Sequence, residues 1–269
     1  ENDRYTKGEN VFKFEEEFAR YIGVRQAVST NSGTAALHIA FIALGLKLGD
    51  EVVTTPLSFV ATANSVIHAG GTPRFADIRF EDYNIDPALV REAVSQNTRA
   101  LLPVHLFGYP ADLNALQEVC DSKELSMVED ACQAIGATFR GRKVGSFGDV
   151  GCFSFYPSKN LWVPGDGGMA TTNDEDLARV MAKLADCGRV SHYEHDMIGY
   201  TYRLSSVNAA VGRVQLRRLD EWNARRRDLA DKYREMLGHI TGIQLPPRGN
   251  SEIQPVYHQF VLLAKHRDE

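Results

Sequence analysis

Lys159 is the residue of this sequence with the clearest potential for chemistry. It follows an apolar aromatic stretch and precedes a Pro/Gly-rich loop, in the segment CFSFYPSKNLWVPGDGG at residues 152–168. An ammonium group that is partly withdrawn from water is costly unless it is paired or used chemically. Because a single lysine at a strand end is most often a surface residue, the other residues of the sequence must decide its role.

Two more segments carry side chains that could bind a charged ligand. In VEDACQAIGA, Asp130 lies just past an expected strand, and Gln133 follows it three residues later. Such a carboxylate either caps the next helix or pairs with a protonated ring nitrogen. In TNSGTAALHIA, Gly33 and Thr34 open a helix whose free N–H groups attract an anion such as phosphate, although the same residues also suit an ordinary N-cap.

These residues need a scaffold that brings them together, and the alternation of elements predicts one. Short β-rich segments are expected at 27–31, 51–56, 72–78, 100–108, 125–131, 152–158 and 168–173. Amphipathic helices are expected between several of them, at 33–46, 60–70 and 112–124, and one long helix at 205–238. This alternation predicts an α/β fold, with a mainly parallel seven-stranded sheet covered by helices on both faces.

In an open parallel sheet, ligands bind at the carboxyl ends of the strands. Asp130, Lys159 and the turn at 31–34 all follow expected strands, as do His105, Glu129 and Ser154. Phe59 also follows a strand end, so its ring either joins the core or stacks on a planar ligand. A Schiff-base lysine, an acid for a pyridine nitrogen, a phosphate cradle and a flat apolar wall together predict pyridoxal 5'-phosphate as cofactor.

Composition narrows the class of partner. The 269 residues are 43% hydrophobic, which is enough for one or two domains, and 30 basic against 35 acidic residues leave a net charge of −5. We therefore expect a small-molecule substrate, with no nucleic acid and no membrane as partner. The four widely spaced cysteines form no zinc-binding pattern and are expected to be reduced, in a cytoplasmic protein. Because the sequence lacks an initial Met and stops after an apolar strand, we also expect a fragment.

Several blocks resemble one family of enzymes. They are NSGTAALHIAFIALGL, PLSFVATANSVIHAGGTPRFADI, LLPVHLFGYPADL, VEDACQAIGATFRGRKVGSFGDVGCFSFYPSKN and YRLSSVNAAVGRVQLRRLDE. In this order they resemble the sugar aminotransferases of the DegT/DnrJ/EryC1/StrS family. The resemblance implies the fold type I architecture of pyridoxal phosphate-dependent transferases, with a large cofactor-binding domain at 1–222. The start of an incomplete small C-terminal α+β domain would follow at 223–269.

The resemblance also implies a role for each candidate residue. Lys159 would be the Schiff-base lysine and Asp130 the partner of the pyridinium nitrogen, with Gln133 near the ring hydroxyl. Ser154, Gly33 and Thr34 would bind the phosphate, and Phe59 would stack on the ring. The family usually has an Asn where this chain has Thr201, in GYTYRL, and that Asn reaches the phosphate from the partner subunit of a homodimer.

The implied reaction is transfer of an amino group from L-glutamate to a keto group of a nucleotide-linked deoxysugar. The loop KNLWVPGDGG favours the 3-keto position, and a 4-keto enzyme is the alternative. A catalytically silent, cofactor-binding member with a regulatory role is a second alternative. Decarboxylation or desulfurisation on the same scaffold is a third, although Cys152, placed at the start of a strand, is expected to be buried.

Overall fold

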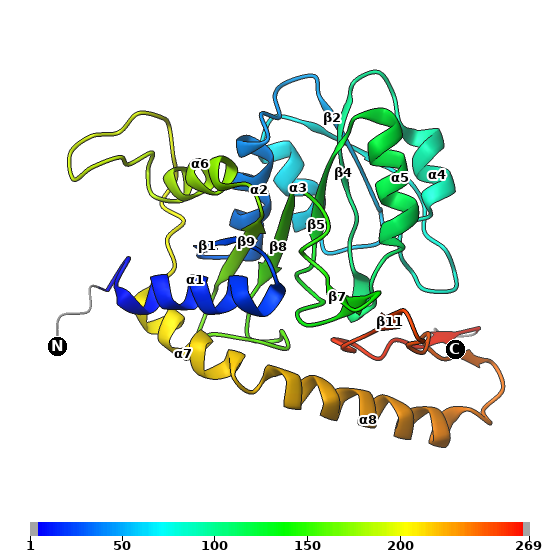
Figure 1. Ribbon diagram of the computed structural model, residues 1–269. Coiled ribbons are helices and arrows are strands. Elements are labelled where there is room, and N and C mark those ends of the chain that lie inside the picture. Colours follow the sequence, from blue (N-terminus) through cyan, green and yellow to red (C-terminus); the bar gives the residue numbers. More distant parts are fainter. Residues whose placement is uncertain (1–4, 266–269) are drawn as a thin grey trace.

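A seven-stranded sheet forms the centre of the molecule (Figure 1), which is described here from a computed structural model covering residues 5–265. Its strands are β1 (Gln26–Thr30), β2 (Glu51–Thr54), β3 (Thr72–Phe75), β4 (Thr98–Leu102), β5 (Ser126–Asp130), β8 (Val150–Ser154) and β9 (Gly168–Thr172). Their order across the sheet is β1-β9-β8-β5-β4-β2-β3, and only β9 runs antiparallel to its neighbours. The predicted mainly parallel, seven-stranded sheet is confirmed.

Alternate residues of each strand enter two separate cores, as the two-residue period of a strand requires. Val53, Leu101 and Phe153 pack into the core on one face. Their chain neighbours Val52 and Leu102 pack into the core on the other face. Both faces of the sheet are buried under a hydrophobic core. The strand sequences are therefore continuous apolar runs rather than an alternation of apolar and polar residues.

Helices cover both faces, as expected. The helices α2 (Gly33–Ala43), α3 (Ala61–His68) and α6 (Glu175–Ala185) lie on one face. The helices α1 (Glu9–Ile22), α4 (Pro87–Ala93), α5 (Leu113–Lys123) and α7 (Ser206–Leu216) lie on the other. The sequence analysis did not single out α1, α4 and α6. A short 3₁₀ turn at Leu106–Gly108 follows β4, where the prediction had extended the strand.

The long helix predicted at 205–238 is wrong, because two helices occupy this stretch. Helix α7 ends at Leu216 and α8 (Leu219–Leu237) begins after a turn at Arg217 and Arg218. Arg218, with φ −108° and ψ −4°, departs from the regular α-helical values of about −63° and −42°. Leu216 and Leu219 are both buried at a helical spacing, so the apolar pattern continues through the break and conceals it.

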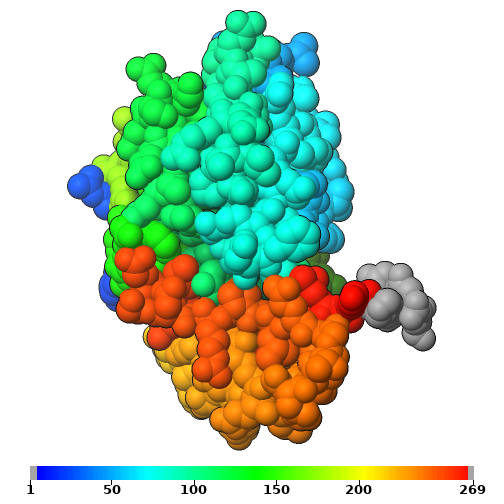
Figure 2. Space-filling model, turned by 90° about the vertical axis from the view of Figure 1, so that its right-hand side faces the viewer, coloured from blue at the N-terminus to red at the C-terminus, as the bar shows by residue number. Residues whose placement is uncertain are grey.

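The C-terminal part of the chain packs beneath the sheet. Helix α8 runs along the lower edge of the molecule in Figure 1, and the orange and red segments form a continuous layer in Figure 2. Its short strands are β10 (Ile243–Gln244), β11 (Ile253–Gln254) and β12 (Leu263–Ala264). Strand β11 pairs with β6 (Thr138–Phe139), which in turn pairs with β7 (Arg142–Lys143), both from the segment between β5 and β8. Buried Arg234 of α8 donates hydrogen bonds to the carbonyls of Pro246 and Pro247, at 2.6 and 2.8 Å, and so fastens this layer.

Among the described residues, no helix is both long and apolar enough to cross a bilayer.

Candidate active site

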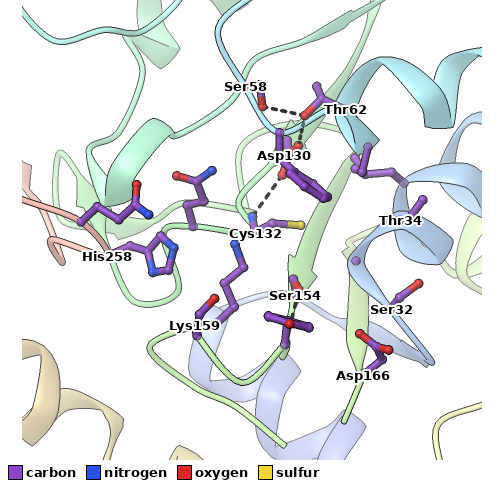
Figure 3. Close-up of a pocket in the computed structure, with 18 residues that line it drawn as sticks. Ser32, Thr34, Ser58, Thr62, Asp130, Cys132, Ser154, Lys159, Asp166 and His258 are labelled. Carbon is purple, nitrogen blue, oxygen red and sulfur yellow. Dashed lines mark hydrogen bonds between the residues drawn. The ribbon is translucent and has the colours of Figure 1, made fainter. Parts of the chain in front are cut away.

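A cavity of about 510 Å³ lies at the carboxyl edge of the sheet, where the strand-end rule predicts a ligand site. Residues that follow β1, β2, β5 and β8 line it (Figure 3). Seven of the eight predicted site residues are among them: Gly33, Thr34, Phe59, Asp130, Gln133, Ser154 and Lys159. The topology therefore brings together side chains from four separate segments of the sequence.

Lys159 is half-buried, and its side chain points into the cavity (Figure 3). The backbone N–H of Lys159 donates to the carbonyl of Tyr156 at 2.8 Å, which closes a tight turn after β8. The next residue, Asn160, anchors this turn by donating to the side chain of Asn223 at 2.8 Å and to the carbonyl of Val256 at 3.1 Å. Within residues 5–265 the ammonium group of Lys159 makes no hydrogen bond or ion pair, so it is available to a ligand.

Asp130 is buried, with a relative exposure of 5%, at the last position of β5. Its Oδ2 accepts a hydrogen bond from the hydroxyl of Thr62 at 2.8 Å, and its Oδ1 accepts one from the backbone N–H of Cys132 at 3.2 Å. Among the described residues no basic side chain forms an ion pair with it. A buried carboxylate without a cation suits a ligand that brings its own positive charge.

A hydrogen bond fixes the orientation of the Gln133 side-chain amide at the cavity. Its Oε1 accepts the backbone N–H of Phe107 at 2.8 Å. Phe107 itself has φ 58°, a left-handed backbone that points this N–H at the glutamine. Because the oxygen is engaged, the amide nitrogen of Gln133 is the group left to donate a hydrogen bond to a ligand.

The N-terminus of α2 forms an open cradle beside Ser154. The Ser32 hydroxyl caps the helix by accepting from the N–H of Ala35 at 3.1 Å, which leaves the N–H groups of Gly33 and Thr34 unused by the cap. A Cβ on Gly33 would lie 2.8 Å from both Cys132 Sγ and Ser154 Cβ, so only glycine fits this close approach. Free amides, a helix dipole and adjacent hydroxyls are the donor set that a phosphate group requires.

Phe59 and Thr201 have different positions relative to the cavity. Phe59 lines it and is 69% exposed, so its ring is not a core side chain in this chain. Thr201 is exposed and does not line it; its carbonyl accepts from the side chain of Asn31 at 3.3 Å. The role that the resemblance gives to Thr201 belongs to a neighbouring subunit, and it stays a prediction.

His105 and Glu129, which the strand-end rule also selected, do not line the cavity. Successive residues of a strand point to opposite faces, so Asp130 faces the ligand site while Glu129 faces the interior. The Glu129 carboxylate accepts from His105 Nε2 at 3.0 Å and from the N–H groups of a nearby loop. Burial alone would raise the pKa of Glu129, but these hydrogen bonds outweigh it and lower the pKa.

Thr62, Cys132 and His258 are among the cavity-lining residues to which the sequence analysis gave no role. His258 comes from the C-terminal layer and faces Lys159 across the cavity (Figure 3). Burial, followed by the charges of Lys159 and Arg226, lowers its pKa to about 4, and its Nδ1 has no hydrogen-bond partner among the described residues. No sequence signal marked His258, because it lies 99 residues from Lys159 along the chain and outside any expected strand end.

Cys132, rather than Cys152, is the thiol at the cavity. Cys152 lies in the middle of β8 and is fully buried, so its expected burial is confirmed but its position at a strand start is wrong. Burial, and next the charge of Asp130, raises the pKa of Cys132 well above its ordinary value. The thiol at the site is therefore protonated and a poor nucleophile.

The fold and the cavity together define an α/β enzyme with a lysine and a carboxylate meeting at the carboxyl edge of a parallel sheet. Comparison with known proteins gives the family. The model of the DegT/DnrJ/EryC1/StrS aminotransferase family matches residues 1–269, and the chain belongs to this family.

Three of its relatives carry informative names. A dTDP-3-amino-3,4,6-trideoxy-alpha-D-glucose transaminase of Streptomyces venezuelae is 42% identical over 100% of this chain and 71% of its own. A UDP-N-acetyl-3-dehydro-alpha-D-glucosamine 3-aminotransferase of Acidithiobacillus ferrooxidans is 40% identical over 94% of this chain and 68% of its own. The crystal structure of S. venezuelae DesV in complex with a ketimine intermediate superposes with a TM-score of 0.96, at 42% identity, over 99% of this chain and 72% of that chain.

Proposed function

We propose that this chain is a pyridoxal phosphate-dependent aminotransferase that moves an amino group from L-glutamate to the 3-keto group of a nucleotide-linked deoxysugar. One observation carries the proposal: the unpaired ammonium of Lys159 and the buried carboxylate of Asp130 share a cavity with an open helix N-terminus. The names of two relatives, both of which specify the 3 position of a nucleotide-linked sugar, support the regiochemistry.

Each residue of the cavity then has a task. Bound pyridoxal phosphate supplies an aldehyde that carries the amino group and a ring that accepts electrons. Lys159 would hold the cofactor covalently through its amine and would move a proton once that amine is free. Asp130 would pair with the protonated ring nitrogen, and the amide of Gln133 would donate to the ring hydroxyl. The N–H groups at 33–34 and the Ser154 hydroxyl would hold the phosphate, while Phe59 would cover one face of the ring.

The rival desulfurisation reaction needs a group that this cavity does not offer in the right state. Desulfurisation needs a thiolate, whereas burial raises the pKa of Cys132 and keeps its thiol protonated. The four free cysteines also agree with a protein of the reducing cytoplasm, which is the compartment we propose.

A homodimer completes the proposal. The segment between α6 and α7 projects from the body of the molecule (Figure 1) and carries exposed apolar side chains, with Tyr193 at 88% and Ile198 at 89%. Large apolar side chains on a projecting segment are typical of a surface that another chain covers. We infer that this segment packs on a second copy and brings Thr201 toward that copy's cavity.

The test is reduction of the protein by borohydride after pyridoxal phosphate has been added, followed by peptide mapping. We expect a phosphopyridoxyl mass on Lys159 in the unaltered chain and no such mass in Lys159→Ala. The control Lys232→Ala, which removes an exposed lysine of α8, should keep the adduct on Lys159. Turnover with glutamate should fall to background in Lys159→Ala alone, because no other amine of the cavity can replace it.

Substrate trials then separate the alternatives. Amination of 3-keto but not 4-keto nucleotide sugars would support the regiochemistry, and the reverse preference would overturn it. An adduct on Lys159 without turnover on either class would support the silent, cofactor-binding alternative. The absence of any adduct on Lys159 would overturn the proposed function as a whole.

A further inference from the structure

Two hydroxyl side chains stand behind Asp130 on the side away from Lys159 (Figure 3). Thr62 lies in the first turn of α3, is 2% exposed, and its Oγ1 is 2.8 Å from Asp130 Oδ2. The Oγ of Ser58 is 2.7 Å from the same Thr62 oxygen. The strand-end rule selects the turn that contains Ser58, but neither it nor the family resemblance gave a role to Ser58 or Thr62.

The chemistry of these groups fixes the direction of both hydrogen bonds. The Thr62 hydroxyl donates to Asp130 Oδ2, so its single proton points at Asp130. Thr62 Oγ1 must then accept the proton of Ser58. The backbone of Thr62 also takes part in hydrogen bonds: its N–H donates to the carbonyl of Phe59 at 3.0 Å, and its carbonyl accepts from Ser65 at 2.9 Å. Neither bond involves the hydroxyl, so neither competes with the bond to Asp130.

The two hydroxyls are the part of Asp130's surroundings that can set its orientation. Its other partner is a backbone N–H two residues further along the same loop, at the longer distance of 3.2 Å. Thr62 is β-branched and sits in a helix, so its side chain has few rotamers. A buried, rigid donor of this kind holds Oδ2 of Asp130 in place.

We propose that Thr62, supported by Ser58, is a positioning residue that keeps the carboxylate of Asp130 aimed at the ring nitrogen of the cofactor. This rests on the proposed function, because the ring nitrogen is that of pyridoxal phosphate. Loss of the Thr62 hydroxyl would leave Asp130 free to rotate and weaken its hold on the ring proton. The cofactor would still bind, because Lys159 and the phosphate cradle are untouched.

The test compares Thr62→Val, which keeps the shape and removes the donor, with Thr62→Ser, which keeps the donor. We expect kcat of Thr62→Val to fall about 10- to 100-fold, the usual effect of losing a supporting hydrogen bond, with KM for glutamate little changed. Thr62→Ser should keep kcat within about threefold of the unaltered chain, because its hydroxyl still donates to Asp130. The kcat of Ser58→Ala should lie between those of Thr62→Val and Thr62→Ser.

Thr54→Val is the matched control for the loss of a buried hydroxyl. Thr54 is fully buried and donates to the carbonyl of Leu102 at 2.8 Å, but it touches neither Asp130 nor the cavity. This variant should lose stability while keeping kcat and the absorbance spectrum of the bound cofactor. The pH at which that absorbance changes should shift in Thr62→Val and stay unchanged in Thr62→Ser and Thr54→Val.

The outcomes for the two proposals are distinct. Without a borohydride adduct on Lys159 in the unaltered chain, the proposed function fails and the role of Thr62 fails with it. An adduct on Lys159 in both chains, combined with an unchanged kcat and an unchanged absorbance titration in Thr62→Val, would overturn the role of Thr62 alone. Equal losses in Thr62→Val and Thr62→Ser would also overturn it, since the hydroxyl would then be irrelevant.

Discussion

His258 shows how a single side chain of the site depends on an element far away in the chain. It reaches the cavity because Arg226 of α8 donates to the carbonyls of Tyr257 and His258, at 3.1 and 3.4 Å, and because Asn160 donates to the carbonyl of Val256. These hydrogen bonds hold residues 256–258 against the turn that carries Lys159. The imidazole is thereby buried beside an ammonium group, which explains its low pKa.

This burial predicts a dependence of stability on pH. The pKa of His258 is lowered to about 4 in the folded chain, whereas an unfolded histidine titrates near about 6.5. Between these values the unfolded state binds more protons, so the free energy of unfolding decreases as pH falls. His258→Gln should remove up to about 1.4 kcal/mol per pH unit of this slope. Urea denaturation of the cofactor-free protein, repeated at several pH values between the two pKa values, measures this slope. If the free energy of unfolding changed with pH in the same way in the unaltered chain and in His258→Gln, the low pKa would not belong to His258.

At the scale of elements, the ends of β4 and β5 are held together by one buried pair. Glu129 accepts from His105 Nε2 and from the N–H groups of Gly145, Phe147 and Gly148, while His105 Nδ1 accepts from Ala111 at 3.1 Å. The backbone N–H of His105 in turn donates to the carbonyl of Asp130 at 3.1 Å. The position of the Asp130 backbone therefore depends on a carboxylate that faces away from the cavity.

We expect Glu129→Gln to destabilise the fold by about 3 to 5 kcal/mol, because an amide cannot accept all four hydrogen bonds and leaves buried donors unpaired. Glu252→Gln is the control. Glu252 pairs with Arg140, and both side chains are about half exposed, at 52% and 51%, so its loss should cost less than about 1 kcal/mol. Urea denaturation measures the stability of both variants. Similar midpoints for Glu129→Gln and Glu252→Gln would show that the buried pair of Glu129 and His105 does not stabilise the fold more than a surface ion pair does.

The elements also show what could be predicted from the sequence and what could not. The alternation of apolar runs and helices predicted the seven strands, and the strand-end rule predicted the cavity with Lys159 and Asp130. The same rule could not separate Asp130 from Glu129, because that depends on which face each side chain meets. The break at Arg217–Arg218 escaped prediction because Leu216 and Leu219 keep the helical period, and Thr62 escaped because a helical threonine carries no signal until its partner is placed.

At the scale of the whole molecule, exposed side chains at the cavity and on the projecting segment both favour the proposed homodimer. Phe59 is 69% exposed at the cavity, Tyr156 is 53% exposed there, and Trp162 of the following loop is 40% exposed. A cofactor ring needs a dry wall on both faces, and these side chains are still open to solvent in one chain. A second copy packed over the cavity would cover them, and the proposed interface at the segment between α6 and α7 would belong to the same dimer.

Ile198→Asp tests this arrangement directly. Ile198 is 89% exposed on the projecting segment, and a buried, unpaired carboxylate at the interface should separate the copies. The unaltered protein should have a mass of about 60 kDa by light scattering, twice the 29.9 kDa of one chain, and the variant a mass near that of one chain. The variant should also bind pyridoxal phosphate more weakly, since each cavity would lose the wall that the second copy provides.

Leu48→Asp is the matched control for this prediction. Leu48 is 92% exposed in the loop between α2 and β2, away from the projecting segment, so a carboxylate there stays in water. This variant should keep both the mass and the cofactor affinity of the unaltered protein. If Ile198→Asp behaved like Leu48→Asp, the projecting segment would not form the interface. If the copies separated but cofactor affinity did not change, each chain would hold its cofactor alone, and Thr201 would have no role across the interface.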